Sequence, residues 1–145
     1  MVQGVLEIDL QETMLLSAVL LVILGASTTW AAHKIDVVNH CRERFSMQIP
    51  GHGVIASVGN NCDTNGVPCT AAEFALVSGI SSADITLIPP HRYNHSLRIT
   101  LTNGQSKSCQ HANCPTAFHQ DGNDGMYQIQ EANNPNSGIK LEFCY

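Results

Sequence analysis

Cysteine and histidine are the reactive residue types that stand out in this sequence. The 145 residues contain six cysteines and seven histidines. An even number of cysteines in a short chain is typical of a disulfide framework, which forms in an oxidising compartment. A zinc site fits less well, because there is no Cys-x-x-Cys and no histidine at ligand spacing from a cysteine pair. The cysteines therefore predict three disulfides and no metal centre.

Six cysteines can be paired in fifteen ways, and the sequence alone does not select one of them. Two spacings are short enough for local bridges, which would leave the first and the last cysteine as a third pair. The pairs would then be Cys62–Cys69, Cys109–Cys114 and Cys41–Cys144. In the chain-entropy model the long loop contributes about 4 to 5 kcal/mol, against about 2 kcal/mol for each short loop.

The histidine spacing gives no further metal site. His91 and His95 are four residues apart, which would bring them together on one helix. Pro89 and Pro90 precede them and a strand is predicted to follow, so no helix is expected. Without a helix, the four-residue spacing does not bring the two side chains together. The sequence also lacks Gly-x-Ser-x-Gly, and its cysteines are expected to be oxidised. We therefore expect surface histidines, no catalytic triad and no cofactor.

The elements that would position these residues are predicted to be short strands. Alternating or β-branched runs separated by Gly, Asn and Pro turns occur at residues 34–38, 54–58, 84–88, 96–102, 126–130 and 139–143. Residues 71–77 could be helix or strand from composition alone. No amphipathic helix is evident after residue 33. This pattern is typical of an all-β antiparallel sandwich.

Composition and charge exclude several function classes. Charged residues make up only 13% of the chain, about half the usual share. The formal net charge of -5 argues against a nucleic-acid-binding surface, which needs clustered Lys and Arg. The hydrophobic content of 43% argues against intrinsic disorder. The length leaves room for one domain and not comfortably for two.

Residues 14–26 form an uninterrupted run of apolar and small residues. At about 13 residues the run is too short to span a membrane but has the length of a signal-peptide core, and small residues follow it. The preceding region is acidic, carrying Glu7, Asp9 and Glu12 and no Lys or Arg, which would be explained if translation starts at Met14. The alternative is a buried helix or an uncleaved anchor. We predict a signal peptide at residues 1–32, a secreted domain at residues 33–145, and no membrane anchor after cleavage.

Five segments, in the same order, resemble strands and turns of the thaumatin-like proteins. They are VVNHC at 37–41, TAAEFAL at 70–76, DITLI at 84–88, CPTAF at 114–118 and IKLEFC at 139–144. Residues 86–93 and 114–119 also closely resemble the short secreted thaumatin-related "glycopeptide" proteins of mushroom-forming fungi. The resemblance covers most of residues 35–144. It implies that residues 71–77 form a strand, that Cys41 pairs with Cys144, and that the fold is a small disulfide-stapled β-sandwich without the family's disulfide-rich second domain.

The resemblance also implies an acidic cleft, which in the family is linked to glucan binding and sometimes to weak glucanase activity. Glu73 and Asp84 match two of the family's cleft acids, and Asp121 or Asp124 matches the last one loosely. Pro89 stands where another acid is expected, and no Arg is securely matched. Glycoside hydrolysis needs two carboxyls at a defined separation, about 5 to 5.5 Å or about 6.5 to 9.5 Å. With half of the cleft missing, catalysis is not expected.

We therefore expect a non-catalytic protein that binds cell-wall carbohydrate, with β-glucan as the implied partner and Glu73, Asp84 and Asp121 as the binding residues. The alternatives are a secreted defence or host-interaction (antimicrobial) protein and a weak endo-β-1,3-glucanase. A plainer interpretation is that backbone donors or Arg92 satisfy these acids. Asn94 begins the only Asn-x-Ser/Thr sequon and is expected to carry a glycan. The oligomeric state is not indicated.

Overall fold

The computed structural model describes residues 32–51, 53–122 and 125–145. The predicted signal peptide, with its alternative start at Met14, lies outside the described residues except for Ala32, and so does Asp124. Within the described ranges, no helix is long and apolar enough to cross a membrane. The boundary near residue 32 therefore stays a prediction.

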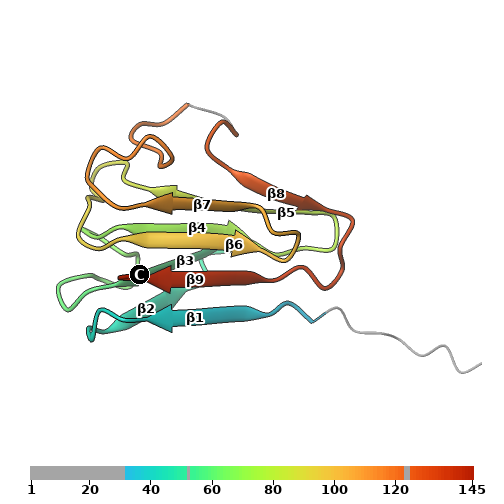
Figure 1. The fold of residues 1–145 in the computed structure, drawn as a ribbon, viewed down its shortest axis with the longest axis horizontal. Helices are drawn as coiled ribbons and strands as arrows, with labels where there is room; N and C mark the ends of the chain where they lie inside the picture. The colour runs from blue at the N-terminus through green and yellow to red at the C-terminus, as the bar shows by residue number, and fades with distance from the viewer. Residues whose placement is uncertain (1–31, 52, 123–124) are drawn as a thin grey trace, which may run out of the picture.

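The described chain is all-β, as predicted, and its strands form two sheets that face each other (Figure 1). One sheet has four strands in the order β1-β9-β6-β7, and the other has five in the order β2-β3-β4-β5-β8. The strands are β1 (Ile35–Asn39), β2 (Phe45–Gln48), β3 (Val54–Val58), β4 (Ala71–Ala75), β5 (Ile80–Thr86), β6 (Leu97–Leu101), β7 (Ser106–Cys109), β8 (Ile129–Ala132) and β9 (Ile139–Phe143).

One strand pair differs from the predicted antiparallel arrangement. β1 and β9 run parallel, with Ile35 opposite Ile139 and Asn39 opposite Phe143, whereas every other pair in the two sheets is antiparallel. The Cys41–Cys144 disulfide lies within two residues of the ends of both strands and joins their carboxyl ends. Two strands whose carboxyl ends are held together must point the same way, which accounts for the parallel pair.

The hydrophobic core lies between the sheets because the strands alternate between apolar and polar residues. On β6, Leu97 and Ile99 are fully buried and pack with Phe143 of β9. Phe74 of β4 and Ile85 of β5 belong to the same cluster and come from the opposite sheet. Full burial of each such side chain stabilises the fold by about 1.5 to 3 kcal/mol. The residues between them point to the outer faces.

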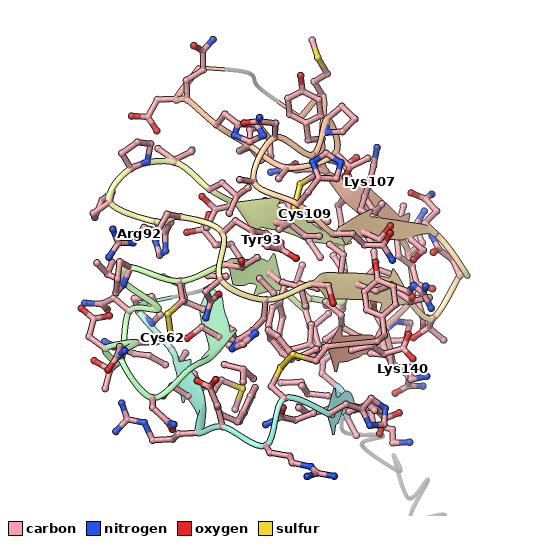
Figure 2. All side chains as sticks on the ribbon, turned by 60° about the vertical axis from the view of Figure 1, so that its left-hand side comes forward. Cys62, Arg92, Tyr93, Lys107, Cys109 and Lys140 are labelled. Atoms are coloured by element: carbon pink, nitrogen blue, oxygen red, sulfur yellow. A yellow bond between two sulfur atoms is a disulfide. The ribbon has the colours of Figure 1, made fainter. Side chains whose placement is uncertain are left out.

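The six cysteines form Cys41–Cys144, Cys62–Cys69 and Cys109–Cys114, with none left free. These are the pairs expected from the short spacings and the resemblance. Figure 2 shows Cys62 and Cys109 well apart, each beside a sulfur–sulfur bond. The first of the two local bridges lies in the β3–β4 connection and the second closes the start of the β7–β8 connection. Both local bridges therefore fix loops, while the long bridge fixes the sheet that contains β1 and β9.

Residues 71–75 form a strand, as the resemblance implied. Two short strands were missed by the sequence pattern, β2 and β7, and the strand predicted at 126–130 begins at Ile129. Tyr127 explains the shift, because its ring packs edge-on against Phe118 with the centroids 5.2 Å apart. The alternation before Ile129 therefore reflects packing within a loop.

Candidate functional site

Glu73 and Asp84 are directly opposite each other on the neighbouring antiparallel strands β4 and β5. Phe74 and Ile85, the residues that follow them, point into the core. Because side chains alternate along a strand, both carboxyls lie on the outer face of the five-stranded sheet. Like charges directly opposite on adjacent strands destabilise a sheet, so this pair has an electrostatic cost.

Three loops approach this outer face. His91 in the β5–β6 loop has its Nδ1 atom 3.2 Å from the carbonyl oxygen of Gly66 in the β3–β4 loop. Phe118 in the β7–β8 loop donates its N–H to the carbonyl of Ile85 at 2.9 Å and accepts from the N–H of Leu87 at 2.8 Å. These bonds extend the sheet beyond the end of β5. Ser57, Ala71 and Thr86, which lie in register on this outer face, are accordingly at most 1% exposed.

Two adjoining hollows remain on this face, and Glu73 and Asp84 line both of them. The larger hollow, of about 430 Å³, is otherwise mostly polar, with Gln120, Asp121 and Gln128 in its wall. The smaller one, of about 250 Å³, has a largely apolar wall that includes Val54, Ile55, Phe74 and Ala75. We call the two hollows together the acidic groove. It has the carboxyl pair at its centre, a polar half and an apolar half.

Burial perturbs both central carboxyls. Asp84 is only 8% exposed, and burial together with the neighbouring Glu73 charge raises its pKa from 3.8 to about 7, against a smaller opposing effect of the Gln128 amide. Burial also raises the pKa of Glu73; the nearby His91 opposes this and Asp121 reinforces it. Among the ion pairs of the described residues, none involves either carboxyl. The Oδ1 atom of Asp84 is buried without a hydrogen-bond partner.

The structure thus brings together the three predicted binding residues, because Asp121 lines the same hollow as Glu73 and Asp84. Arg92 does not neutralise them: it is exposed and borders a separate hollow with Glu43. In Figure 2 it extends outward at the edge of the molecule. The plainer interpretation, with Arg92 as the partner of these acids, is therefore wrong.

Two amides of the groove, Gln120 and Gln128, were not singled out from the sequence. Gln128 immediately precedes β8, and the register that pairs Ala83 with Ile129 brings it beside Asp84. No spacing in the sequence identifies such a residue, because its position depends on the pairing of two strands and on where the second one begins.

The histidines form no metal centre in the part of the chain that the structure describes. There, the one group of side chains at metal-ligand spacing is His95 with Cys41 and Cys144, whose sulfurs are bonded to each other. A disulfide supplies no thiolate ligand. The Nε2 atom of His95 instead lies 3.2 Å from the Oε1 atom of Glu43.

The side chain of Asn94 is part of the internal hydrogen bonding. Its Nδ2 atom donates to the carbonyl of Val58 at 2.8 Å, and its Oδ1 atom accepts from the N–H of Thr70 at 2.9 Å. The Asn94 N–H donates to the Thr70 hydroxyl at 3.1 Å. Gly59 lies so close that a Cβ atom there would be 2.9 Å from Nδ2. This crowding counts against the expected glycan, which would be attached to Nδ2.

Comparison with known proteins supports a thaumatin-like relationship. The chain is 30% identical over 84 residues to thaumatin-like pathogenesis-related protein 2 of Avena sativa; the match covers 58% of this chain and 46% of that protein. The chain thus spans about half the length of this curated relative. No family model matches.

A similar arrangement occurs in a solved structure, the thaumatin-like xylanase inhibitor TLXI. The TM-score is 0.50 at 12% sequence identity, and the match covers 77% of this chain and 99% of the inhibitor. At this identity the likeness concerns the fold. The chain therefore has the two-sheet, disulfide-bonded fold of thaumatin-like proteins.

Proposed function

We propose that this chain is a secreted, non-catalytic thaumatin-like protein that binds cell-wall carbohydrate in the acidic groove. The observation that carries the proposal is the Glu73–Asp84 pair at the junction of a polar and an apolar hollow. Saccharides present hydroxyl groups at their edges and apolar C–H groups on their ring faces, so they match a groove that offers both kinds of wall. The resemblance suggests β-glucan as the ligand and a fungal source for the protein.

We propose binding without turnover because the chain lacks part of the acidic cleft that the resemblance implies: Pro89 stands where another acid is expected, and no Arg is securely matched. Glycosidases use two carboxyls that flank the scissile bond, one protonated and one ionised. Here the two side chains project from one sheet face as immediate cross-strand neighbours, whose Cβ atoms lie about 4.5 to 5.5 Å apart in such pairs. The raised pKa of Asp84 is a feature of general acids, so weak endo-β-1,3-glucanase activity is the enzymatic alternative to test.

Secretion is supported by the three disulfides, which are typical of oxidising compartments. We propose that residues 1–32 direct the chain into this route and are then removed. Expression of the full sequence in a secreting host, followed by mass measurement of the product, tests this. A product that begins near residue 33 supports the proposal, and a retained amino-terminal segment contradicts it.

A role in defence is the second candidate. It is favoured by the similarity to a protein named as pathogenesis-related, to which the chain is 30% identical. Growth inhibition of a competing microbe by the purified protein would support this role. It need not exclude wall binding, because attachment to a wall would be one way to reach such a target.

A sedimentation assay tests the proposed binding. The secreted protein is mixed with insoluble β-1,3-glucan or chitin, the polymer is pelleted, and the supernatant is assayed for protein and for released sugar. We expect depletion of the protein without release of sugar, and loss of binding in the Glu73→Gln/Asp84→Asn double variant. Asp36→Asn is the matched control, because Asp36 is exposed on β1 of the other sheet.

Release of sugar by the wild type, but not by the double variant, would overturn the non-catalytic assignment. Binding that the double variant retains would overturn the placement of the ligand in the groove.

A further inference from the structure

We propose that the acidic groove prefers saccharides that carry a positively charged amine, such as chains of glucosamine, over neutral saccharides. This inference rests on the proposed function, because it names the chemical class of the bound saccharide. It concerns one buried acceptor without a donor and the negative charge of the groove, which a neutral sugar does not balance.

Among the described residues, the lining of the groove is acidic and contains no Lys or Arg. Glu73 and Asp84 line both hollows, and Asp121 lines the larger one. The basic group that acts on the pair is the imidazole of His91, which opposes the rise in the pKa of Glu73. Charges interact strongly where water is excluded. A bound cation would therefore be attracted by all three carboxyls and would reduce the repulsion between them.

A second observation, independent of the acidic composition, points to a donor. The Asp84 side chain is more than nine-tenths buried, lines both hollows, and has its Oδ1 atom without a hydrogen-bond partner. A buried acceptor without a partner costs about 1 to 3 kcal/mol, and more when it is charged. Because Oδ1 itself is not accessible from the hollows, the Asp84 carboxyl has to rotate for an ammonium group between Glu73 and Asp84 to reach it. The ammonium group then supplies three hydrogen-bond donors and the positive charge that the groove lacks. A sugar hydroxyl would bring a donor but no charge.

A metal ion fits these residues less well than an amine on a larger molecule. Among the described residues, no set of three His, Cys, Asp or Glu ligand atoms in the groove falls within 4.8 Å of one another. The groove also extends well beyond the size of an ion, with hollows of about 430 and 250 Å³. The Gln120 and Gln128 amides can bind hydroxyl groups, and Val54 and Ile55 can contact a ring face. A sugar ring that carries an amine uses all of these features.

Binding of a cation should also displace protons. The groups that act on the Glu73–Asp84 pair are Asp121 from the β7–β8 loop and His91 from the β5–β6 loop. A cation favours the ionised form of Asp84, so it lowers the pKa of that carboxyl from about 7. Protons are therefore released on binding near neutral pH, which a neutral saccharide does not cause.

Three hexasaccharides of matched length test the proposal by calorimetry on the secreted protein: glucosamine, N-acetylglucosamine and β-1,3-linked glucose. At about pH 6, where such amines are protonated, we expect the glucosamine hexamer to bind at least about tenfold tighter than the other two. The preference should shrink between about 0.01 and 1 M salt. Repeating the titration in two buffers of different ionisation enthalpy should detect the released protons.

The variants distinguish binding in the groove from general attraction to an acidic protein. Glu73→Gln and Asp84→Asn should each remove most of the amine preference, whereas the matched charge change Asp36→Asn should preserve it. Equal loss in all three variants would overturn the assignment to the groove. Circular dichroism and the melting temperature of each variant show whether it is folded.

Two further outcomes separate this inference from the proposed function. Equal affinity for the three hexamers would overturn the amine preference and leave saccharide binding in place. Absence of binding to all three, together with absence of sedimentation with either polymer, would overturn the proposed function itself and this inference with it.

Discussion

The acidic residues on the outer faces of the two sheets have opposite surroundings: ion-paired and near solvent on one face, unpaired and at least partly buried on the other. On the four-stranded sheet, Glu142 lies 2.8 Å from Lys140 and 3.7 Å from Arg98, and these charges are at least partly exposed. On the five-stranded sheet, Glu73 and Asp84 face each other, partly or wholly buried, without an ion pair. The first face has the paired charges of an ordinary solvated surface. The second retains an unfavourable arrangement, which is the pattern expected of a site that serves function at the expense of stability.

The loops account for much of the difference. The connections that follow β3, β5 and β7 gather over the five-stranded sheet, where the hydrogen bonds of His91, Phe118 and Asn94 hold them. On the other sheet, Arg98 extends over the Tyr145 ring at 3.9 Å, and its neighbours remain open to solvent. Loop cover removes water from one set of acids and leaves the other set hydrated. Burial raises the pKa of Glu73 and Asp84 on the covered face, whereas the hydrogen bond with Lys140 lowers the pKa of Glu142 on the open face.

The largest effect is expected for Asp84→Asn. The pKa of Asp84 is raised from 3.8 to about 7 in the folded state, so ionisation disfavours folding. The contribution of Asp84 to stability is most favourable below about pH 4, declines as the pH rises towards 7, and is constant above that. One pKa unit corresponds to about 1.4 kcal/mol, so at alkaline pH the free energy of unfolding of the variant should exceed that of the wild type by on the order of 4 kcal/mol.

Urea unfolding with the disulfides intact, repeated across this pH range, measures that gain. The wild-type free energy of unfolding should decrease towards neutral pH, and the variant should lose most of this slope. A residual slope of the same sign is expected from Glu73, whose pKa is also raised. Asp36→Asn serves as the control for the loss of one negative charge at an exposed site outside the groove. A variant with the wild-type profile would show that Asp84 is not strained, and the contrast between the two faces would disappear.

The next effect concerns the anchoring of the loops. Asn94→Ala removes the donor to the Val58 carbonyl and the acceptor for the Thr70 N–H, so we expect a loss of about 2 to 4 kcal/mol. Since the same amide would carry a glycan, we also expect Asn94 to be unmodified in the folded, secreted protein. The mass of the wild type and its peptides checks this. Ser96→Ala destroys the sequon while retaining Asn94; it should change the mass only by the oxygen atom that the substitution removes, with no loss of glycan mass, and should leave stability nearly unchanged.

A glycan found at Asn94 in the folded protein would contradict this expectation. It would also imply that the loops over the five-stranded sheet are held differently, because Nδ2 could not keep both its sugar and its present surroundings.

The strands that were predictable from the sequence are those whose alternation reflects burial. β6 and β9 alternate apolar and polar residues because one side faces the core and the other faces solvent. β2 and β7 lie at sheet edges and are short, so Phe45–Gln48 and Ser106–Cys109 contain little alternation to detect. The Cys41–Cys144 bridge was predicted, and it agrees with the parallel pairing of β1 and β9, but no pattern within either strand contains the direction of that pairing.

The site was predictable only in part. Glu73 and Asp84 were found through the thaumatin-like resemblance, and their pairing then required the β4–β5 register. The buried Oδ1 atom of Asp84 and the approach of Gln128 could not be inferred, because both depend on how loops distant in sequence cover the sheet. Sequence patterns record which face of a strand is apolar. They contain much less information about what covers the other face.

The smallest effect, and the one that completes the comparison, is expected for Glu142→Gln on the four-stranded sheet. Its hydrogen bond with Lys140 lowers the pKa of Glu142 below 4.5, and Arg98 acts in the same direction. The stabilisation is therefore present above the unfolded-state value and is lost as the pH falls through the folded-state value, opposite in sign to the effect of Asp84. Because the pair is near solvent, the loss should be below about 1 kcal/mol near neutral pH and should vanish at high salt.

Urea unfolding at low and high salt measures this loss, with Lys140→Met as a second way to break the same pair. A loss of several kcal/mol that persists in salt would mean that these charges are as shielded as the groove carboxyls. The two faces would then differ in the sign of their charge interactions but not in their exposure to water. A small, salt-sensitive loss would instead leave loop cover as the physical reason why only the acids of the five-stranded sheet form a site.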